Sequence, residues 1–206
     1  SLLQYELDEP LYALIKKVGA NAAIDTYLEG VRSIEKLGSI IKSLKADCGF
    51  ERKQSVYMAH SKKDAEWLLT EFEARQRIGL KVTWLTKERL KRKFDATGEG
   101  AILSETGAAA DVYQLVRCLI EYSIKNYRLR VFDHTELVEV ENLKDSCEAK
   151  VSGGSIIKAR KIVYATGYES QAMLRDKVVD LISTFTFISE PLKIPSHLRH
   201  TLFWDT

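Results

Sequence analysis

The residues best suited to chemistry lie in segment 158–170, KARKIVYATGYES. After polar residues, the apolar run 162–165 is typical of a strand that is covered on both faces. This run ends in Ala165, Thr166 and Gly167, and ligands of open α/β sheets bind outside the carboxyl ends of strands. Glycine there lets the main chain approach a nucleotide or turn with positive φ. A buried strand with an ordinary glycine turn explains the same residues, so both interpretations stay open.

The other polar residues form no recognisable catalytic or metal-binding set. His197 and His200 are spaced as two ligands on a helix could be, but no third ligand of suitable type is near, so no metal site is predicted. The three cysteines, Cys48, Cys118 and Cys147, are far apart and are expected to be free thiols of a cytoplasmic protein. No serine or cysteine stands in a nucleophile motif.

The elements that must position these residues follow from hydrophobic periodicity. Helices are predicted over 11–18, about 21–45, 62–78, 87–94 and 112–126. Ser61 with Asp64 predicts a capping box, and Asp111 is expected to cap the last helix. Gly30 and Gly38, inside the second helix, are interpreted as places where a neighbour approaches closely.

Strand patterns lie between these helices and after them. Strands are predicted over 54–59, 82–85, 101–105 and 184–189. An antiparallel meander is predicted from 129–132, 136–141 and 147–151, leading into a buried strand that ends at Thr166. The expected fold class is therefore mixed α/β (α+β).

Composition excludes several classes of protein. The 206 residues carry 31 Lys and Arg against 29 Asp and Glu, so the net charge of +2 does not support a nucleic-acid partner. No apolar run reaches the ~18 residues of a membrane span, and no signal peptide opens the chain. Composition thus indicates a globular cytoplasmic protein and says nothing of its chemistry.

Several motifs, taken in order, resemble the FAD-dependent oxidoreductases of the D-amino-acid-oxidase-like superfamily, which includes glycine, sarcosine and γ-glutamylputrescine oxidases. The motifs are SLLQYE at 1–6, QSVYMA at 54–59, VTWLT at 82–86, GAAADVYQL at 107–115, the meander followed by ATG at 165–167, and FTFISEP at 185–191. Together they cover nearly the whole chain. The resemblance implies a two-domain flavoprotein fold, with the meander and buried strand in the FAD domain and other strands in the sheet of the substrate domain.

The family's strand, G-x-G-x-x-G and helix are absent from this sequence. The lone Gly98-Glu99-Gly100 follows no convincing strand and is rejected as a phosphate-binding turn. We therefore expect an internal piece of a longer oxidoreductase that lacks both ends. Such a piece should purify colourless and without FAD, and its exposed sheet edges would favour self-association.

The resemblance assigns roles to individual positions. Ala165, Thr166 and Gly167 would border FAD, Leu137 would place main-chain groups against the adenine, and Gln4 (with Leu3) would lie near the flavin. Tyr57, Phe185 and Phe187 would line the substrate cavity. Residues 1–53 form a helical region, 54–106 and 181–206 belong to the substrate domain, and 107–180 to the FAD domain.

The function implied is oxidation of a C–N bond of a small amine or amino acid, with a hydride passing to FAD. Within flavoenzymes, a 2-hydroxy-acid or glycerol-phosphate dehydrogenase is the alternative. From another class, a non-catalytic α+β binding module would explain the missing glycine motif without truncation. The catalytic residues are not predicted.

Overall fold

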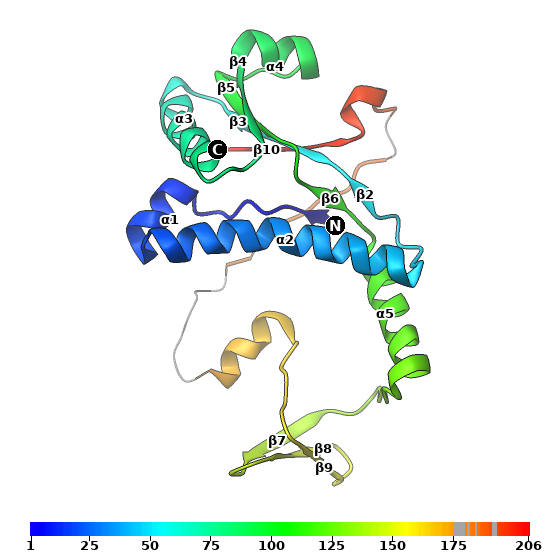
Figure 1. Cartoon of the computed structure of the whole chain (residues 1–206). Helices are drawn as coiled ribbons and strands as arrows, with labels where there is room; N and C mark the ends of the chain where they lie inside the picture. Colours follow the sequence, from blue (N-terminus) through cyan, green and yellow to red (C-terminus); the bar gives the residue numbers. More distant parts are fainter. Residues whose placement is uncertain (175–179, 181, 184, 191–192) are drawn as a thin grey trace. The chain divides into compact units, whose positions relative to one another are not determined.

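The computed structural model describes residues 1–174, 180, 182–183, 185–190 and 193–206. The chain divides into two compact units, residues 1–129 with 193–206, and residues 130–192. Figure 1 labels the elements of both units. In the described part of the chain, no helix combines the length and apolar character needed to cross a membrane.

The first unit contains five helices and seven strands among its described residues. The helices are α1 (Leu11–Val18), α2 (Ala20–Leu44), α3 (Lys62–Arg77), α4 (Lys87–Phe94) and α5 (Val112–Tyr127). The strands are β1 (Leu2–Leu3), β2 (Glu51–Arg52), β3 (Gln54–Ala59), β4 (Val82–Thr86), β5 (Gly100–Ser104), β6 (Ala108–Ala109) and β10 (Thr201–Asp205), with a short 3-10 helix at Ser196–Leu198.

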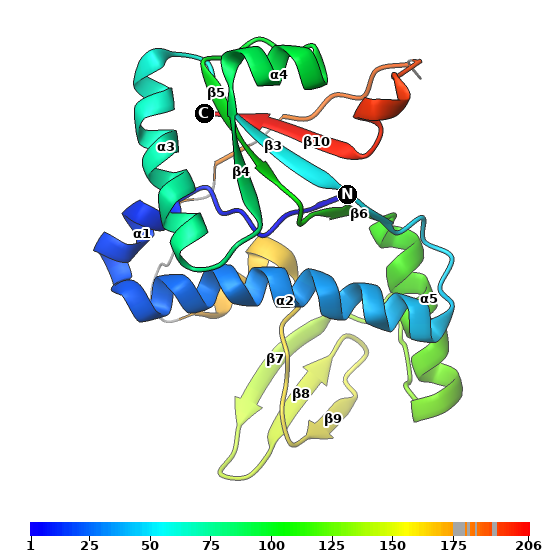
Figure 2. The same cartoon turned by 45° about the horizontal axis from the view of Figure 1, so that its top comes forward.

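A four-stranded sheet in the order β10-β3-β5-β4 is the centre of this unit. β10 is parallel to β3, and the other two pairings are antiparallel. Because side chains alternate along a strand, Tyr57 packs with α3 on one face and Val56 packs with α4 on the other. Figure 2 shows α3 and α4 beside this sheet. The predicted strands of this sheet are confirmed within one residue at their ends, whereas β10 was not predicted.

The long helix α2 buries an apolar stripe, with Tyr27 fully buried and Ile34 and Ile41 nearly so. The prediction that a neighbouring segment approaches closely at Gly30 is confirmed, because a Cβ atom there would lie 3.1 Å from Cβ of Tyr5. Segment 4–9 therefore passes close over α2 at this glycine. A side chain at position 30 would push this segment away.

The predicted helix caps are confirmed. Asp64 N–H donates to Ser61 Oγ, and Ser61 N–H donates to Asp64 Oδ2, both at 3.1 Å. Gln114 N–H donates to Asp111 Oδ1 at 3.0 Å. These local bonds satisfy main-chain donors that a helix start leaves open, so the starts of α3 and α5 are set by a few neighbouring residues.

The second unit holds an antiparallel sheet of β7 (Leu137–Asn142), β8 (Cys147–Val151) and β9 (Ile156–Ala159), followed by a 3-10 helix at Gly167–Met173. The predicted meander is thus present, but the prediction of a strand over 129–132 is wrong. Arg128, in the left-handed conformation, ends α5, and Leu129, Val131 and Phe132 are exposed. Apolar character alone does not make a strand where no neighbouring strand pairs with it.

The predicted strands over 162–166 and 185–189 are also not formed. Val163 is 85% exposed, and Phe185 and Phe187 are each 94% exposed. An apolar strand is stable when layers cover both faces, and the described residues supply no such cover here. Thr184, where the second of these strands was predicted to begin, lies outside the described residues.

Candidate functional site

A hollow of about 210 Å³ lies beside β7 in the second unit. Its apolar lining includes Leu137, Val140, Tyr164 and Met173, and Asn142 adds an amide. Two segments that the resemblance had linked to the cofactor, the meander strand that holds Leu137 and the run that leads into ATG, therefore border one hollow. The volume is below the ~300–1,000 Å³ of a site for a whole small molecule, and suits one part of a larger ligand.

The main chain of β7 is available to a ligand in this hollow. β7 is an edge strand, because β8 pairs with it on one side only. Edge strands present unpaired N–H and C=O groups. The register also shifts between Leu137 and Glu139. A bulge of this kind changes the direction in which the residues at a strand end point. At Leu137, unpaired main-chain polar groups and an apolar side chain therefore lie next to each other.

The structure places the ATG motif directly after the Tyr164 wall of the hollow. Ala165, Thr166 and Gly167 are exposed and belong to no strand. Gly167 has φ of +69°, and it opens the 3-10 helix Gly167–Met173. The glycine therefore has the conformational role expected of it, although the buried strand before it is not formed.

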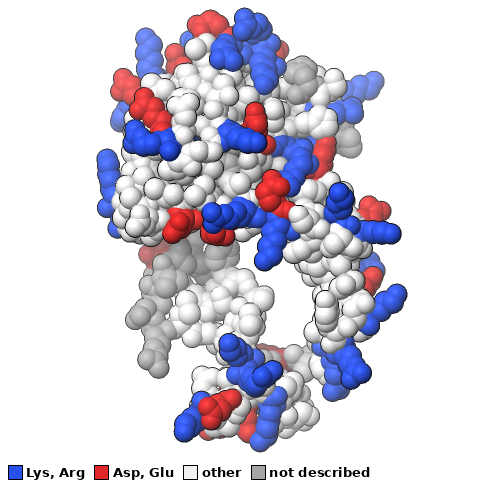
Figure 3. All heavy atoms as spheres, in the orientation of Figure 1, with Lys and Arg blue, Asp and Glu red and all other residues white. Residues whose placement is uncertain are grey.

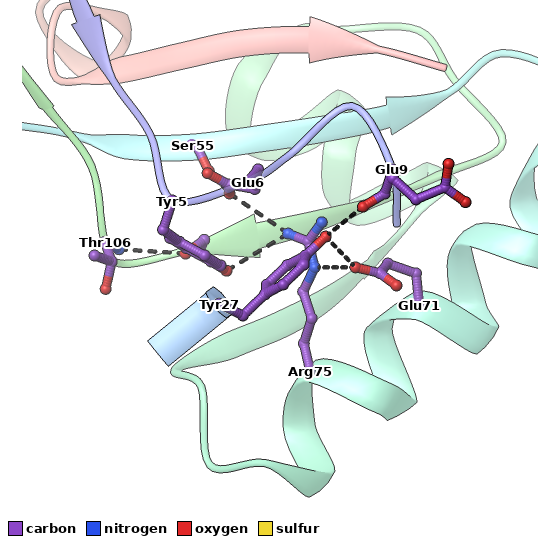
Figure 4. A network of polar contacts seen from close by, with 9 residues as sticks. Tyr5, Glu6, Glu9, Tyr27, Ser55, Glu71, Arg75 and Thr106 are labelled. Carbon is purple, nitrogen blue, oxygen red and sulfur yellow. Dashed lines mark hydrogen bonds and ion pairs between the residues drawn. The ribbon is translucent and has the colours of Figure 1, made fainter. Parts of the chain in front are cut away.

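A buried polar network is the main electrostatic feature of the first unit (Figure 4). Arg75 Nε donates to Glu71 Oε1 at 2.6 Å, and both side chains are fully buried. Arg75 Nη1 lies 3.5 Å from Glu6 Oε1, which accepts from Ser55 Oγ at 2.5 Å. The Arg75 guanidinium also lies 5.6 Å from the ring centre of Tyr5. Helix α3, strand β3 and segment 4–9 are joined in this way.

The second carboxylate oxygen of Glu71 and the ring of Tyr27 extend the network to α1 and α2. Tyr12 N–H donates to Glu71 Oε2 at 3.0 Å. Tyr27 Oη lies 3.1 Å from the carbonyl oxygen of Glu9 and 3.4 Å from Glu71 Oε1. Each end of Glu71 thus contacts a different element, which sets the positions of α1, α2 and α3 together.

Burial controls the protonation of this network. Desolvation raises the pKa of Glu6 above its ordinary value, although Ser55 and Arg75 favour the carboxylate. Burial also raises the pKa of Tyr5 to about 12, against the opposing effect of Arg75. Desolvation acts to lower the pKa of Arg75, but the charges of its neighbours outweigh it and the pKa is raised. Arg75 is therefore a permanent buried cation.

Three buried polar atoms in this region have no hydrogen-bond partner among the described residues. They are Gln4 Nε2, Glu6 Oε2 and Arg75 Nη2. Buried donors and acceptors normally have a hydrogen-bond partner, and one that has none in the protein is usually paired with a water molecule or a ligand. Gln4 Nε2 is a donor on the segment that the resemblance placed near the flavin, so this observation is compatible with that assignment.

The predicted substrate residues are placed in two different environments. Tyr57 is 7% exposed, and its ring stacks on Trp204 at 3.8 Å between ring centres and meets Trp67 edge-on. Phe185 and Phe187 are fully open to solvent and lie in the other unit. A role in lining a substrate cavity remains a prediction for all three residues.

Glu71 and Arg75 were missed at the sequence level. Their four-residue spacing in α3 matches that of a surface ion pair, which is the usual interpretation. A signal was present, because Leu68 and Ala74 place the same side of α3 in the core. No cluster of three metal-ligating side chains occurs where the structure describes the chain. Cys48, Cys118 and Cys147 are free, as predicted.

Comparison with known proteins identifies the family. Residues 16–203 match the family model described as DAO, FAD dependent oxidoreductase. The chain belongs to this family, whose cofactor is FAD. No curated protein sequence matches the chain.

Solved structures share the fold. Glycine oxidase from Geobacillus kaustophilus matches with a TM-score of 0.59 at 20% identity, over 69% of this chain and 40% of that one. L-proline dehydrogenase from P. horikoshii gives 0.56 at 17% identity, over 69% and 40%. L-amino acid deaminase from Proteus vulgaris gives 0.62 at 14% identity, over 82% and 38%. The chain thus spans about two fifths of the length of these structures.

The described residues fit part of the FAD molecule. The hollow beside β7 offers apolar walls and edge main-chain groups, which suit the adenine end. Gln4 Nε2 is a buried donor without a partner, which suits a polar edge of the flavin. The motif that would bind the pyrophosphate, G-x-G-x-x-G, does not occur in this sequence.

Proposed function

We propose that this chain is part of an FAD-dependent enzyme that oxidises a C–N bond of a small amine or amino acid. The observation that carries the proposal is the family match over 16–203. The names of the structural relatives, which include a glycine oxidase, a proline dehydrogenase and an amino-acid deaminase, favour this substrate class over 2-hydroxy acids and glycerol phosphate.

In this proposal the second unit holds the adenosine end of the cofactor. Main-chain groups of β7 at Leu137 meet the base, the Tyr164 side chain closes one wall, and Ala165, Thr166 and Gly167 border the adjoining part. The open conformation of Gly167 lets the main chain come close to the ligand. These residues bind and orient, and they move no proton.

The first unit contributes the substrate side and one contact to the flavin. FAD, when bound, would supply the hydride acceptor for this reaction. Gln4 Nε2 would donate to the ring system, and the network of Arg75 holds the segment that carries Gln4. Tyr57 lines the substrate cavity in this proposal.

The test uses the complete reading frame that encodes this sequence. The purified protein should show flavin absorption, release FAD on denaturation, and be bleached anaerobically by one or more amines or amino acids. Gly167→Val should lower the FAD content, because valine is strained at positive φ and would obstruct the approach. Val131→Ala, at an exposed position of the same unit, is the matched control. A full-length protein that binds no flavin would contradict the proposal.

If the full-length protein binds FAD but only 2-hydroxy acids or glycerol phosphate bleach it, the proposed cofactor is correct and the proposed substrate class is wrong. For the 206-residue chain alone we expect a colourless preparation, because the phosphate-binding turn is absent from it. An absorption spectrum checks this expectation, and a yellow preparation with stoichiometric FAD would refute it.

A further inference from the structure

A pocket of about 490 Å³ lies between α4 and the sheet in the first unit. Three cations, Arg89, Arg92 and Lys93, line it from one helix. Their spacing of three and four residues puts them on neighbouring positions of the helix surface. Figure 3 shows lysine and arginine side chains gathered over α4 at the top of the view.

The three cations form no salt bridge with any residue that the structure describes. Within the described ranges of the chain, no carboxylate lies within ion-pair distance of Arg89, Arg92 or Lys93. The other basic residues of the same region behave differently. Lys87 pairs with Glu99 at 2.7 Å, and Lys91 pairs with Asp95 at 2.6 Å. Helix α4 therefore carries two kinds of basic residue: Lys87 and Lys91, which are paired with acids, and the three cations that line the pocket.

The fold imposes this arrangement. Thr86 ends β4 and caps α4, with Arg89 N–H donating to Thr86 Oγ1 at 3.4 Å, so the helix turns back over the sheet immediately. Leu90 and Phe94 are buried against the sheet. The residues beside them on the helix are therefore carried to the rim of the space between helix and sheet.

The rest of the lining combines an apolar floor with polar groups. Leu85 and Leu103 are almost fully buried and form the floor. Thr83 adds a hydroxyl and Gln54 an amide, while Glu105 is the single acid. Cations outnumber the acid three to one, and the volume is that of a site for a small molecule. Such a lining suits a ligand with a charged end and an apolar body.

We propose that this pocket binds a small oxyanion, a phosphate or carboxylate group carried on a molecule with an apolar part. The guanidinium groups of Arg89 and Arg92 provide paired N–H donors that match either oxyanion, and Lys93 adds a point charge. The apolar part of the ligand rests on Leu85 and Leu103. This site is independent of FAD and of the proposed oxidation.

The experiment is isothermal titration calorimetry, in which the full 206-residue chain is titrated at low salt with inorganic phosphate, phenyl phosphate or benzoate. We expect saturable binding of phenyl phosphate or benzoate, tighter than that of inorganic phosphate because of the apolar floor. Whichever of the two binds more tightly identifies the oxyanion. Added salt should weaken the binding, since the cations are exposed.

The variant Arg89→Ala/Arg92→Ala should weaken binding by about tenfold or more, because two charge-assisted contacts are lost. Lys91→Ala is the matched control, since it removes one cation of the same helix outside the pocket. Circular dichroism confirms that both variants fold. Absence of saturable binding for all three probes would overturn the proposal, and so would equal weakening in the control, which would show only general charge attraction.

Discussion

Arg75 is the residue on which most of the buried polar contacts of the first unit converge. Its guanidinium contacts Glu71, Glu6 and the ring of Tyr5 with no exposure to solvent. A buried charge pair adds little net stability compared with apolar residues, but removing one partner leaves the other unpaired. The network therefore specifies how segment 4–9 sits against α3 and β3.

Arg75→Met should lower the free energy of unfolding by about 3–5 kcal/mol, because Glu71 would remain buried without its partner. Urea denaturation followed by circular dichroism measures this loss. The double variant Glu71→Leu/Arg75→Met should be less destabilised than the single one, since no lone charge is left. A single variant as stable as the natural protein would show that water reaches this region.

Glu6 predicts a pH dependence. Its pKa is raised above the ordinary value of 4.5, so the folded state binds this proton more readily than the unfolded state does. The stabilisation from Glu6 is then complete below about pH 4.5 and is lost as the pH rises through the folded-state pKa. In the variant Glu6→Gln the side chain cannot ionise, so this pH-dependent loss of stability does not occur.

The difference in unfolding free energy, natural protein minus Glu6→Gln, should therefore fall as the pH rises from about 4.5 to 7. Urea titrations across this range measure it. Glu66→Gln, at an exposed position of α3, is the control and should show no such trend. A difference that rises with pH would mean that Arg75 outweighs desolvation at Glu6.

At the scale of elements, close packing between neighbouring strands determines which residues are tolerated. In the register of the sheet, Gly100 of β5 pairs with Thr86 of β4, and Trp84 pairs with Ile102, so Gly100 lies diagonally across from Trp84 on the same face. A Cβ atom at position 100 would lie 2.4 Å from Cζ2 of Trp84. The indole ring therefore occupies the space that any other residue would need.

Gly100→Ala should cost about 1–3 kcal/mol of stability, because the Trp84 ring must move in a packed region. Thr83→Ala, at an exposed position of β4, should change stability by less than about 0.5 kcal/mol. Thermal unfolding monitored by tryptophan fluorescence reports on both variants. An unchanged melting temperature for Gly100→Ala would mean that the ring has another place to go.

At the scale of the whole molecule, apolar residues of the second unit remain open to solvent. Ile182, Phe185, Phe187 and Ile188 are each at least 85% exposed. Several exposed apolar residues close together in the chain favour association with other surfaces. We therefore expect these four exposed residues to contribute most to the predicted self-association of the chain.

Sedimentation velocity should therefore show the mean sedimentation coefficient rising with protein concentration. The variant Phe185→Ser/Phe187→Ser should reduce this rise, because two large apolar rings are removed. Tyr113→Ser, at an exposed position of α5 in the first unit, is the control. Equal behaviour of the three proteins would place the association elsewhere or rule it out.

Sequence and structure agree best where the information is local. The sequence by itself determined the helices, the caps at Ser61 and Asp111, the strands of the central sheet except β10, and the family. The reason is that periodicity, capping and short motifs depend on residues within a few positions of one another. Gly30 could be interpreted for the same reason, since a glycine inside a long amphipathic helix indicates a close neighbour.

Only the tertiary structure decided the long-range features. These are the pairing of β10 with β3, the burial of Glu71 and Arg75, the hollow that joins Leu137 to Tyr164, and the failure of residues 162–166 and 185–189 to form strands. An apolar run becomes a strand, and an ion pair becomes buried, only when segments distant in sequence cover it. No local pattern contains that information, because burial is a property of the neighbours in space.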